Sequence, residues 1–521
     1  HRESRPLPRP VPHRMVLVLC NGVCHYYTDI AQSEERCGPV DIVVRDGSIE
    51  SITEASGSTV GNPSAALKAM VGDDIEIVDC EGKHILPGGI DPHVHLNYPQ
   101  GGNAIYSADN WTTGTRAALM GGTTSVIDFI EPKPDTEGVD GDSSFQPIET
   151  EVVRRKGEAE ADSLCDFSFH IFLLPPFLRH LQKLVDMGYP SFKIYTVYNG
   201  LKIDATKSIS QCMESIANAK GMAMVHCEND AMVAEGIAQC QSEGKESARY
   251  AQESRPELGE VESTTRVLCL ADLHGTAVHI AHMSLDTCAT LVDTYSARRE
   301  REDTVTGEVT AHHFCLDESL YKEWDHPEDL VMAPPLRPSS DVTSLSKRVA
   351  EGQLATCSDH CPFNRLQRTG LRRTPDTDDT WWTQGGIPPF WCMPGGTAGI
   401  EHRYIMAYQA AMATDSPLSD RLRCAGLGVA GRAAQVFGIQ GKGYLAPGMD
   451  ASITVVDPSS TTPVSASTHN QHLDHTLFEG VTASGAVSTV LRRGEVCVRD
   501  GVWQQGVTGG EFFTRSVAHK Y

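Results

Sequence analysis

The stretch SFKIYTVYNGLKIDATKSISQCMESIANAKGMAMVHC, residues 191–227, decides the fold class. It begins with a short apolar run, Ser191–Thr196, which predicts a buried β-strand. A helical segment follows, because these apolar residues share one face at helical spacing: Ile209, Cys212, Met213, Ile216 and Ala217. Gly221 is a stop signal for that helix, and Ala223–Val225 begins a second strand. The stretch therefore predicts one β-α-β unit.

Short apolar runs of the same kind recur through the middle of the chain. Together with the two strands above they make about eight candidates, the others being Ile85–Leu96, Thr123–Phe129, Phe167–Leu174, Ala277–Met283, Glu308–Phe314 and Ala355–Asp359. Most are followed by a helical pattern, and this alternation predicts an α/β fold with a closed (β/α)8 TIM-like barrel. The alternative is an open doubly wound sheet, but no G-x-G-x-x-G motif opens any of the helices.

Both ends of the chain have a different pattern of apolar residues and turns from the middle. Short apolar runs separated by turn pairs such as Asn21-Gly22 predict β-strands near the N-terminus and again after about Gly441. We expect residues 15–84 and 441–521 to form a small β-sandwich domain, and residues 85–440 to form the barrel domain. Residues 1–14 are rich in Arg and Pro, and we expect a disordered extension rather than a secretory signal.

Composition excludes several classes of function. Among 521 residues, 44 are Lys or Arg and 68 are Asp or Glu, so the net charge is −24. This balance argues against binding nucleic acid or an anionic membrane through bulk charge. No apolar run reaches the roughly 18–20 residues that span a bilayer. The 16 cysteines show no regular spacing, which is typical of reduced thiols in a cytoplasmic protein.

The strongest chemical signal is the sequence GGIDPHVH, residues 88–95. Residues i and i+2 of a strand share a face, so His93 and His95 should point the same way. Two neighbouring imidazoles are a natural chelate for a divalent metal ion. Catalytic groups of a barrel lie at the C-terminal ends of its strands, where this motif is expected. The motif therefore predicts a metal site at the end of the first barrel strand.

Later strand candidates carry further polar residues. Lys193 is flanked by apolar residues within a strand, where a free cation is costly to bury. His226 and Asp359 each end a strand candidate. His279 and His282 are three residues apart, so at most one of them enters the barrel, and periodicity does not say which. Together these residues predict a ring of imidazoles with a carboxylate on successive strands.

The order H-x-H, Lys, His, His, Asp on eight strands resembles the amidohydrolase superfamily, and more narrowly the dihydropyrimidinase/hydantoinase group of cyclic amidohydrolases. The resemblance runs from about Met15 to Trp503. Several segments carry it in order and spacing: Gly121-Gly122-Thr123-Thr124, Ser191-Phe192-Lys193, Val225-His226-Cys227-Glu228-Asn229, Ala281-His282-Met283-Ser284, Pro334-Pro335-Leu336-Arg337, Ser358-Asp359-His360-Cys361-Pro362-Phe363 and Phe478-Glu479-Gly480.

The resemblance implies two divalent metal ions, usually zinc, with six ligands: His93, His95, Lys193, His226, His282 and Asp359. The first two histidines and the aspartate would hold the more buried ion, and the other two histidines the second. Lys193 would be carboxylated by carbon dioxide and bridge both ions as a carbamate, so the buried group is no longer a cation. The resemblance also selects His282, which leaves His279 to point outward into the helix layer.

The implied activity is hydrolysis of a cyclic amide by a hydroxide that bridges the two ions. The substrate would be a dihydropyrimidine, a hydantoin or a related cyclic imide or ureide. Asp359 would act as general base and then as general acid. Tyr198, five residues after Lys193, would stabilise the oxyanion and contact the substrate. The resemblance further implies a homo-oligomer, a tetramer or a dimer.

Two substrate-binding positions depart from the group. Ala333-Pro334-Pro335 stands where Ser-Pro-Pro is usual, and Pro394-Gly395-Gly396 stands where Pro-Asn-Gly is usual. Main-chain contacts of Ala333 and Gly395 can survive both changes, although glycine leaves more space. Allantoinases also tend to have Ala at the first position, so an allantoinase-like ureide hydrolase is an alternative, and a linear amide substrate stays open. A non-catalytic scaffold like the collapsin-response mediator proteins is a further alternative, but all six ligand positions are filled here.

The segment after the last barrel strand is long, aromatic and rich in Pro. Residues 366–394 contain Trp381, Trp382 and Trp391, which suits either a lid over the substrate or a packed oligomer contact. Four arginines in or beside this segment are expected to be a solvated charge run rather than an anion site: Arg365, Arg368, Arg372 and Arg373. His312 and His313 are expected on the seventh strand, facing opposite ways.

Overall fold

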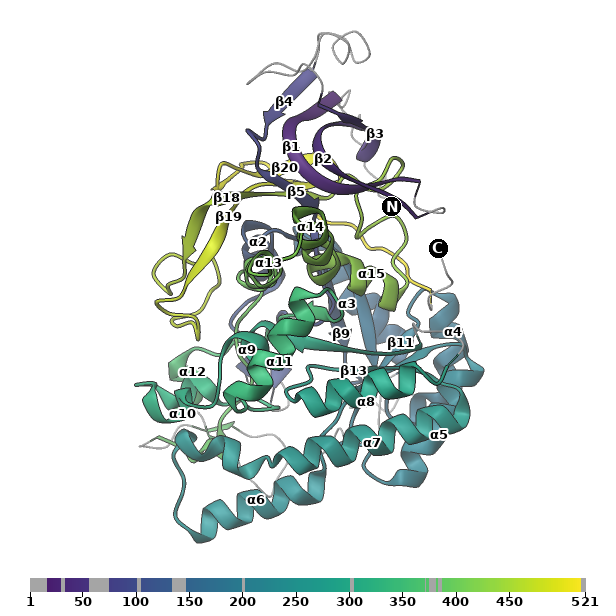
Figure 1. Ribbon diagram of the computed structural model, residues 1–521. Coiled ribbons are helices and arrows are strands. Elements are labelled where there is room, and N and C mark those ends of the chain that lie inside the picture. Colours follow the sequence, from purple (N-terminus) through teal and green to yellow (C-terminus); the bar gives the residue numbers. More distant parts are fainter. Residues whose placement is uncertain are drawn as a thin grey trace, which may run out of the picture.

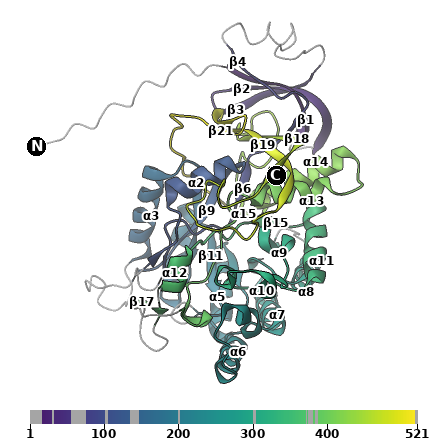
Figure 2. The same ribbon diagram turned by 90° about the vertical axis from the view of Figure 1, so that its left-hand side faces the viewer.

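A computed structural model of the chain describes residues 16–29, 33–55, 75–100, 105–133, 147–198, 202–299, 304–370, 372–373, 381–382 and 387–516. The expected extension 1–14 lies outside the described residues. Figures 1 and 2 show a barrel surrounded by helices, with a β-rich part at the end of the molecule opposite helix α6 (Asp230–Ser242).

The barrel is built from eight parallel strands whose spatial order is their chain order. They are β6 (Gly89–Asp91), β9 (Thr123–Ile130), β10 (Asp166–Phe172), β11 (Ser191–Tyr195), β12 (Met222–His226), β13 (Ala277–Ile280), β14 (Val305–Thr310) and β15 (Ala355–Cys357). The first and last strands meet just past their ends, where the His95 N–H donates to the carbonyl of His360 at 2.9 Å. Val94 and His360 form a parallel bridge at the same place. The expected barrel is confirmed.

Helices cover the outside of the barrel, so both faces of its strands are buried. The long helices are α2 (Trp111–Met120), α3 (Ile148–Asp162), α5 (Thr206–Asn218), α6, α7 (Glu257–His274), α8 (Asp286–Ser296), α11 (Ser339–Ala350), α13 (Arg403–Met412) and α14 (Leu418–Gly426). Helix α5 buries four of the five apolar residues of its predicted face, and the fifth, Ala217, is half-buried.

Short elements connect these layers. Among them are α4 (Leu181–Asp186), α9 (Ala311–Cys315), α10 (Leu320–Glu323), α12 (Arg365–Gly370) and α15 (Arg432–Phe437), the 3-10 helices η1 (Pro175–His180), η2 (Ala248–Ser254), η4 (Pro327–Leu330) and η5 (Phe390–Cys392), and the π-helical turn η6 (Leu427–Gly431). Two small antiparallel ladders pair β7 (Pro99–Gln100) with β8 (Ile105–Tyr106), and β16 (Arg372–Arg373) with β17 (Trp381–Trp382).

A nine-stranded sheet joins the two ends of the chain. Its N-terminal strands are β1 (Val16–Asp29), β2 (Glu34–Arg45), β3 (Ser48–Glu54), β4 (Ile75–Asp79) and β5 (His84–Pro87). Its C-terminal strands are β18 (Ile453–Pro463), β19 (Thr482–Arg492), β20 (Glu495–Arg499) and β21 (Val502–Trp503). The two groups meet where β5 pairs antiparallel with β18. The last described residues return to the barrel, where Phe512 bridges to Phe167.

Two strand predictions need correction. The run Ile85–Leu96 is not one strand: β5 belongs to the nine-stranded sheet, β6 belongs to the barrel, and Gly88 separates them. Strand β6 stops before Pro92, which lacks a backbone N–H. The seventh strand ends at Thr310, whose hydroxyl accepts a hydrogen bond from the His313 N–H and caps α9. His312 and His313 therefore lie in a buried helical turn.

Packing of α2 against the loop before α13 gives a stability prediction. A Cβ added at Gly121 would lie 2.1 Å from the backbone oxygen of Glu401, so Gly121→Ala should lower the free energy of unfolding by about 1–3 kcal/mol. Gly157→Ala is the matched control, because its Cβ would meet nothing within 4 Å on helix α3. That exchange should raise the free energy of unfolding by about 0.5–1 kcal/mol. Urea unfolding of both variants would contradict the prediction if the two shifts had the same sign.

Candidate metal centre

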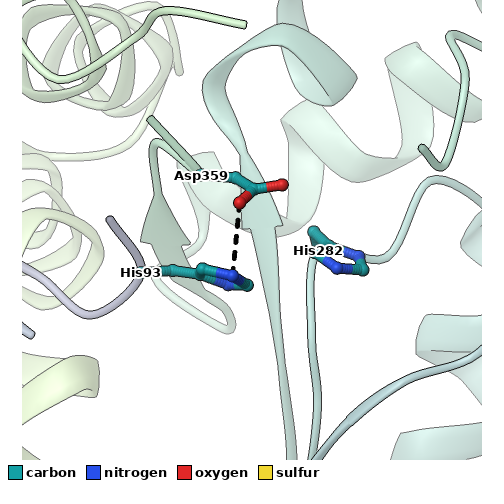
Figure 3. A group of neighbouring side chains, drawn as sticks. All are labelled: His93, His282 and Asp359. Carbon is teal, nitrogen blue, oxygen red and sulfur yellow. Dashed lines mark ion pairs between the residues drawn. The ribbon is translucent and has the colours of Figure 1, made fainter. Parts of the chain in front are cut away.

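The first group of predicted ligands meets at one carboxylate oxygen. His93 and His95 lie on the extended segment after β6, and Asp359 follows β15. Each of the two histidine Nε2 atoms is 3.2 Å from Oδ1 of Asp359. Figure 3 shows His93 and His282 on either side of this carboxylate. These side chains are therefore close enough to share one ion.

Lys193 lies beside this group, in the middle of β11. Its side chain is fully buried, and Nζ is 3.4 Å from Nε2 of His93. No carboxylate oxygen of the described residues lies within 4.0 Å of Nζ. Burial lowers the pKa of Lys193 to about 8, so the neutral amine is far more populated near physiological pH than it is for an exposed lysine. A buried neutral amine is the form that reacts with carbon dioxide.

His226 and His282 complete the set. His226 ends β12, and its Nδ1 is 2.9 Å from Nε2 of His282. The ring of His282 is also 5.3 Å from the ring of His93, centroid to centroid. All six predicted ligands thus lie together at the C-terminal end of the barrel. Figure 3 shows how His282 reaches the group from a loop rather than from a strand.

The chemistry of these donors fits divalent metal ions. Tetrahedral coordination with bonds of 2.0–2.1 Å places ligand atoms about 3.3 Å apart, close to the 3.2 Å separations around Asp359. Burial, with Lys193 nearby, lowers the pKa of His93 to about 4, and burial holds the pKa of His282 well below its usual range. Burial alone would raise the pKa of Asp359, but the neighbouring histidines hold it well below its usual value. Neutral imidazoles and an ionised carboxylate are the forms that ligate metals.

Carboxylates outside this group orient the imidazoles. Glu308 on β14 accepts a hydrogen bond from Nδ1 of His93 at 2.6 Å, which turns Nε2 toward Asp359. Glu228 does the same for His226, at 2.7 Å from Nε2, and turns Nδ1 toward His282. Arg255 pairs with Glu228 at 2.5 Å. Against the effect of burial, this guanidinium and the imidazole lower the pKa of Glu228 to about 2.

Tyr198 and the two expected substrate segments border the group. The Tyr198 ring lies 5.2 Å from the ring of His226, and the guanidinium of Arg255 is 5.6 Å from the same tyrosine ring. Ala333 and Gly395 are half-buried on two neighbouring segments, since the Gly396 N–H donates to the carbonyl of Val331 at 3.0 Å.

Comparisons with known proteins agree with this architecture. Residues 84–148 match the amidohydrolase family. The chain is 29% identical over 470 residues to the D-hydantoinase of Streptomyces coelicolor, covering 88% of this chain and 91% of that protein. It is also 29% identical over 484 residues to the dihydropyrimidinase of Rattus norvegicus, covering 91% of this chain and 85% of that one. The chain is a relative of the dihydropyrimidinases and D-hydantoinases. The predicted resemblance is confirmed.

Solved structures of these hydantoinase relatives have the same fold. A D-hydantoinase structure superposes with a TM-score of 0.81 at 25% identity, covering 97% of this chain and 100% of that one. The dihydropyrimidinase of Brevibacillus agri gives a TM-score of 0.82 at the same identity and coverage. The barrel with an additional β-sandwich domain is therefore confirmed as the fold class. None of the helices in the described part of the chain is long and apolar enough to cross a bilayer.

The structure contradicts the expected orientation of His279. Its Nε2 is 3.3 Å from Oε2 of Glu308, and its ring lies 4.9 Å from Phe437, so it points into the barrel and not into the helix layer. Strand alternation does not apply to the pair, because β13 ends at Ile280 and His282 has a φ of 33°. Both histidines of this hydantoinase relative therefore face the interior.

The expected solvated run of arginines is also wrong where it can be tested. Arg365 forms an ion pair with the buried Asp329 at 2.7 Å, and Arg368 is fully buried. The side chains of Arg372, Arg373, Trp381 and Trp382 lie outside the described residues, so the lid and the oligomer contact stay predictions.

Glu228 offers a test of how the imidazoles are held. Glu228→Gln removes the charge that orients His226 and pairs with Arg255. The affinity for the metal ion that His226 would hold, one of the two expected ions, should therefore fall by about 10–100-fold. Titration with zinc, followed by metal analysis, measures this. Glu262→Gln is the control, because Glu262 contacts Asn229 near the site but no imidazole of the group. Equal affinities in the two variants would contradict the role assigned to Glu228.

Proposed function

We propose that the protein hydrolyses a ring amide with two divalent metal ions, acting on a hydantoin, a dihydropyrimidine or a related cyclic imide or ureide. The observation that carries this proposal is the convergence of four imidazoles, one carboxylate and one buried lysine at the barrel mouth. Relatives named D-hydantoinase and dihydropyrimidinase support the substrate class.

The ions would be zinc, held in two positions. His93, His95 and Asp359 would hold one ion, and His226 and His282 the other. Lys193, carboxylated to a carbamate, would bridge them. The buried amine without a carboxylate partner among the described residues supports this modification, because a carbamate converts a costly cation into an anionic ligand.

When bound, the ions lower the pKa of a shared water and polarise the substrate carbonyl. Asp359 accepts the proton of the attacking water on a carboxylate oxygen and returns it to the ring nitrogen that leaves. The hydroxyl of Tyr198 donates a hydrogen bond to the developing oxyanion. Phe129 stacks on His95 at 4.6 Å and limits access of bulk water from that side.

Main-chain groups of Ala333 and Gly395 would hold the ring of the substrate. Their side chains are a methyl group and a hydrogen, so these positions leave more room than Ser and Asn would. In this arrangement main-chain groups would bind the polar atoms of the substrate ring, and the pocket would accept larger substituents on that ring.

A combined metal and turnover assay tests the function. Protein loaded with zinc should hold about two equivalents per chain and open a hydantoin or dihydrouracil ring. The same screen includes allantoin, cyclic imides and a linear amide. Turnover of allantoin alone would favour the ureide hydrolase. Absence of bound metal would favour the non-catalytic scaffold and overturn the proposal.

Two further expectations belong to the proposal. We infer that the protein is cytoplasmic and forms a homo-oligomer, a tetramer or a dimer. Light scattering of the purified chain and fractionation of cells that express it measure these properties, and a monomer by light scattering would contradict the assembly.

A further inference from the structure

We propose that Arg368 is a positioning residue that holds together the two backbone segments that bind the substrate. These segments are Val331–Ala333 and Pro394–Gly396, called here the substrate segments. The inference rests on the proposed function, since it assigns substrate binding to their main chain. From its sequence context this arginine was expected to carry a solvated surface charge.

The guanidinium of Arg368 is surrounded by carbonyl oxygens. It lies on α12 and donates to the carbonyls of Phe363 at 3.2 Å and Glu328 at 3.1 Å. It also donates to both substrate segments: to Val331 at 3.1 Å, to Pro394 at 3.2 Å and to Gly396. The planar guanidinium presents its N–H donors in a fixed fork, so these contacts restrain the relative positions of three backbone segments, at Phe363, Glu328–Val331 and Pro394–Gly396.

Carbonyls take the place of a carboxylate partner for this cation. Arg368 is fully buried, and no carboxylate oxygen of the described residues lies within 4.0 Å of it. The carboxylate of Asp329 on η4 is bound by Arg365 at 2.7 Å. Burial lowers the pKa of Arg368 to about 10, which still leaves a cation at neutral pH. The guanidinium also lies 5.9 Å from the centre of the Phe363 ring, so carbonyl dipoles and an aromatic face together stabilise the buried charge.

The two substrate segments also contact each other directly through their backbones. Gly395 and Gly396 carry no side chains, and the Gly396 N–H shares the Val331 carbonyl with Arg368. The Cys361 N–H donates to the carbonyl of Thr397 at 2.9 Å, which connects the second segment to the loop after Asp359. Arg368 therefore fixes the spacing between the two segments and their distance from Asp359. Its loss should disturb substrate binding more than chemistry.

Replacements of Arg368 test this assignment. Arg368→Met keeps length without donors, and Arg368→Lys keeps charge but replaces the fork by one ammonium. With full metal content, we expect Arg368→Met to raise KM about tenfold or more for a substrate that the wild type hydrolyses. Its kcat should stay within about threefold of the wild-type value. Arg368→Lys should give a smaller rise. Arg365→Met is the matched control on the same helix, because Arg365 binds Asp329 and neither substrate segment, and its KM should equal that of the wild type.

The outcomes separate this inference from the proposed function. If the wild type with two zinc ions opens no ring, the proposed function fails and this assignment falls with it. If the wild type is active and Arg368→Met has an unchanged KM, only the assignment to Arg368 fails. A fall in metal content that parallels the loss of activity would also overturn it. Should Arg368→Met not fold, Arg368→Lys decides, since a wild-type KM in that variant contradicts the inference.

Discussion

Lys193→Ala should lose at least one of the two metal ions and lower kcat/KM by about 1,000-fold or more. The lysine lies on β11 and is buried against His93, with Nζ 3.4 Å from Nε2 of the histidine. Its removal deletes the proposed bridging anion, and the remaining four neutral imidazoles and one carboxylate do not balance the charge of two divalent ions. Metal analysis after dialysis and steady-state kinetics measure the two effects.

Short carboxylic acids provide the sharpest control for this variant. Acetate or formate fits the space left by the side chain and can supply the missing anion, so partial recovery of metal binding and turnover is expected. Lys202→Ala is the matched variant and should keep full activity. The ammonium of Lys202 pairs with the carboxylate of Asp230 at 2.5 Å and not with the imidazoles of the site. Full activity of Lys193→Ala without added acid would refute the carbamate.

Asp359→Asn should lower kcat by about 1,000-fold, because the amide neither accepts the proton of the attacking water nor returns one to the leaving nitrogen. The exchange conserves shape, so His93 and His95 keep a neighbour of the same size. Kinetics at saturating zinc separate lost proton transfer from weaker metal binding. Asp204→Asn, at a half-exposed carboxylate, is the control. A variant with full metal that retains more than a tenth of kcat would exclude Asp359 as the general base.

Much of the fold followed from local patterns. Apolar runs located most barrel strands because strands covered on both faces are continuously apolar, but the first was merged with β5 and the seventh was placed too far toward the C-terminus. The candidate ligands drew attention because each follows or interrupts such a run, but the resemblance to the cyclic amidohydrolases, and not periodicity, selected His282 over His279. Glu308, Glu228 and Arg255 were missed as orienting groups, since their partners are identified only by distance in space. Glu308, for example, is 215 positions away from His93 in the chain.

Strand periodicity failed where the backbone leaves the strand. Tyr198, His282 and Asp359 all have positive φ values, of 79°, 33° and 48°. Positive φ reverses the chain direction locally and breaks the alternation of faces. The rule that excluded one of His279 and His282 assumed a strand through residue 282, whereas the strand ends at Ile280. Such backbone conformations often occur at functional sites, where side chains must turn toward a ligand.

The pairing of β5 with β18 has a consequence for how the protein matures. Strand β5 leaves the ribosome long before β18, yet only Gly88 separates it from β6 and the segment that carries His93 and His95. In a nascent chain this strand lacks its partner on one side until most of the polypeptide has been made. We therefore expect the proposed metal ions to be acquired after translation is essentially complete, rather than by the growing chain.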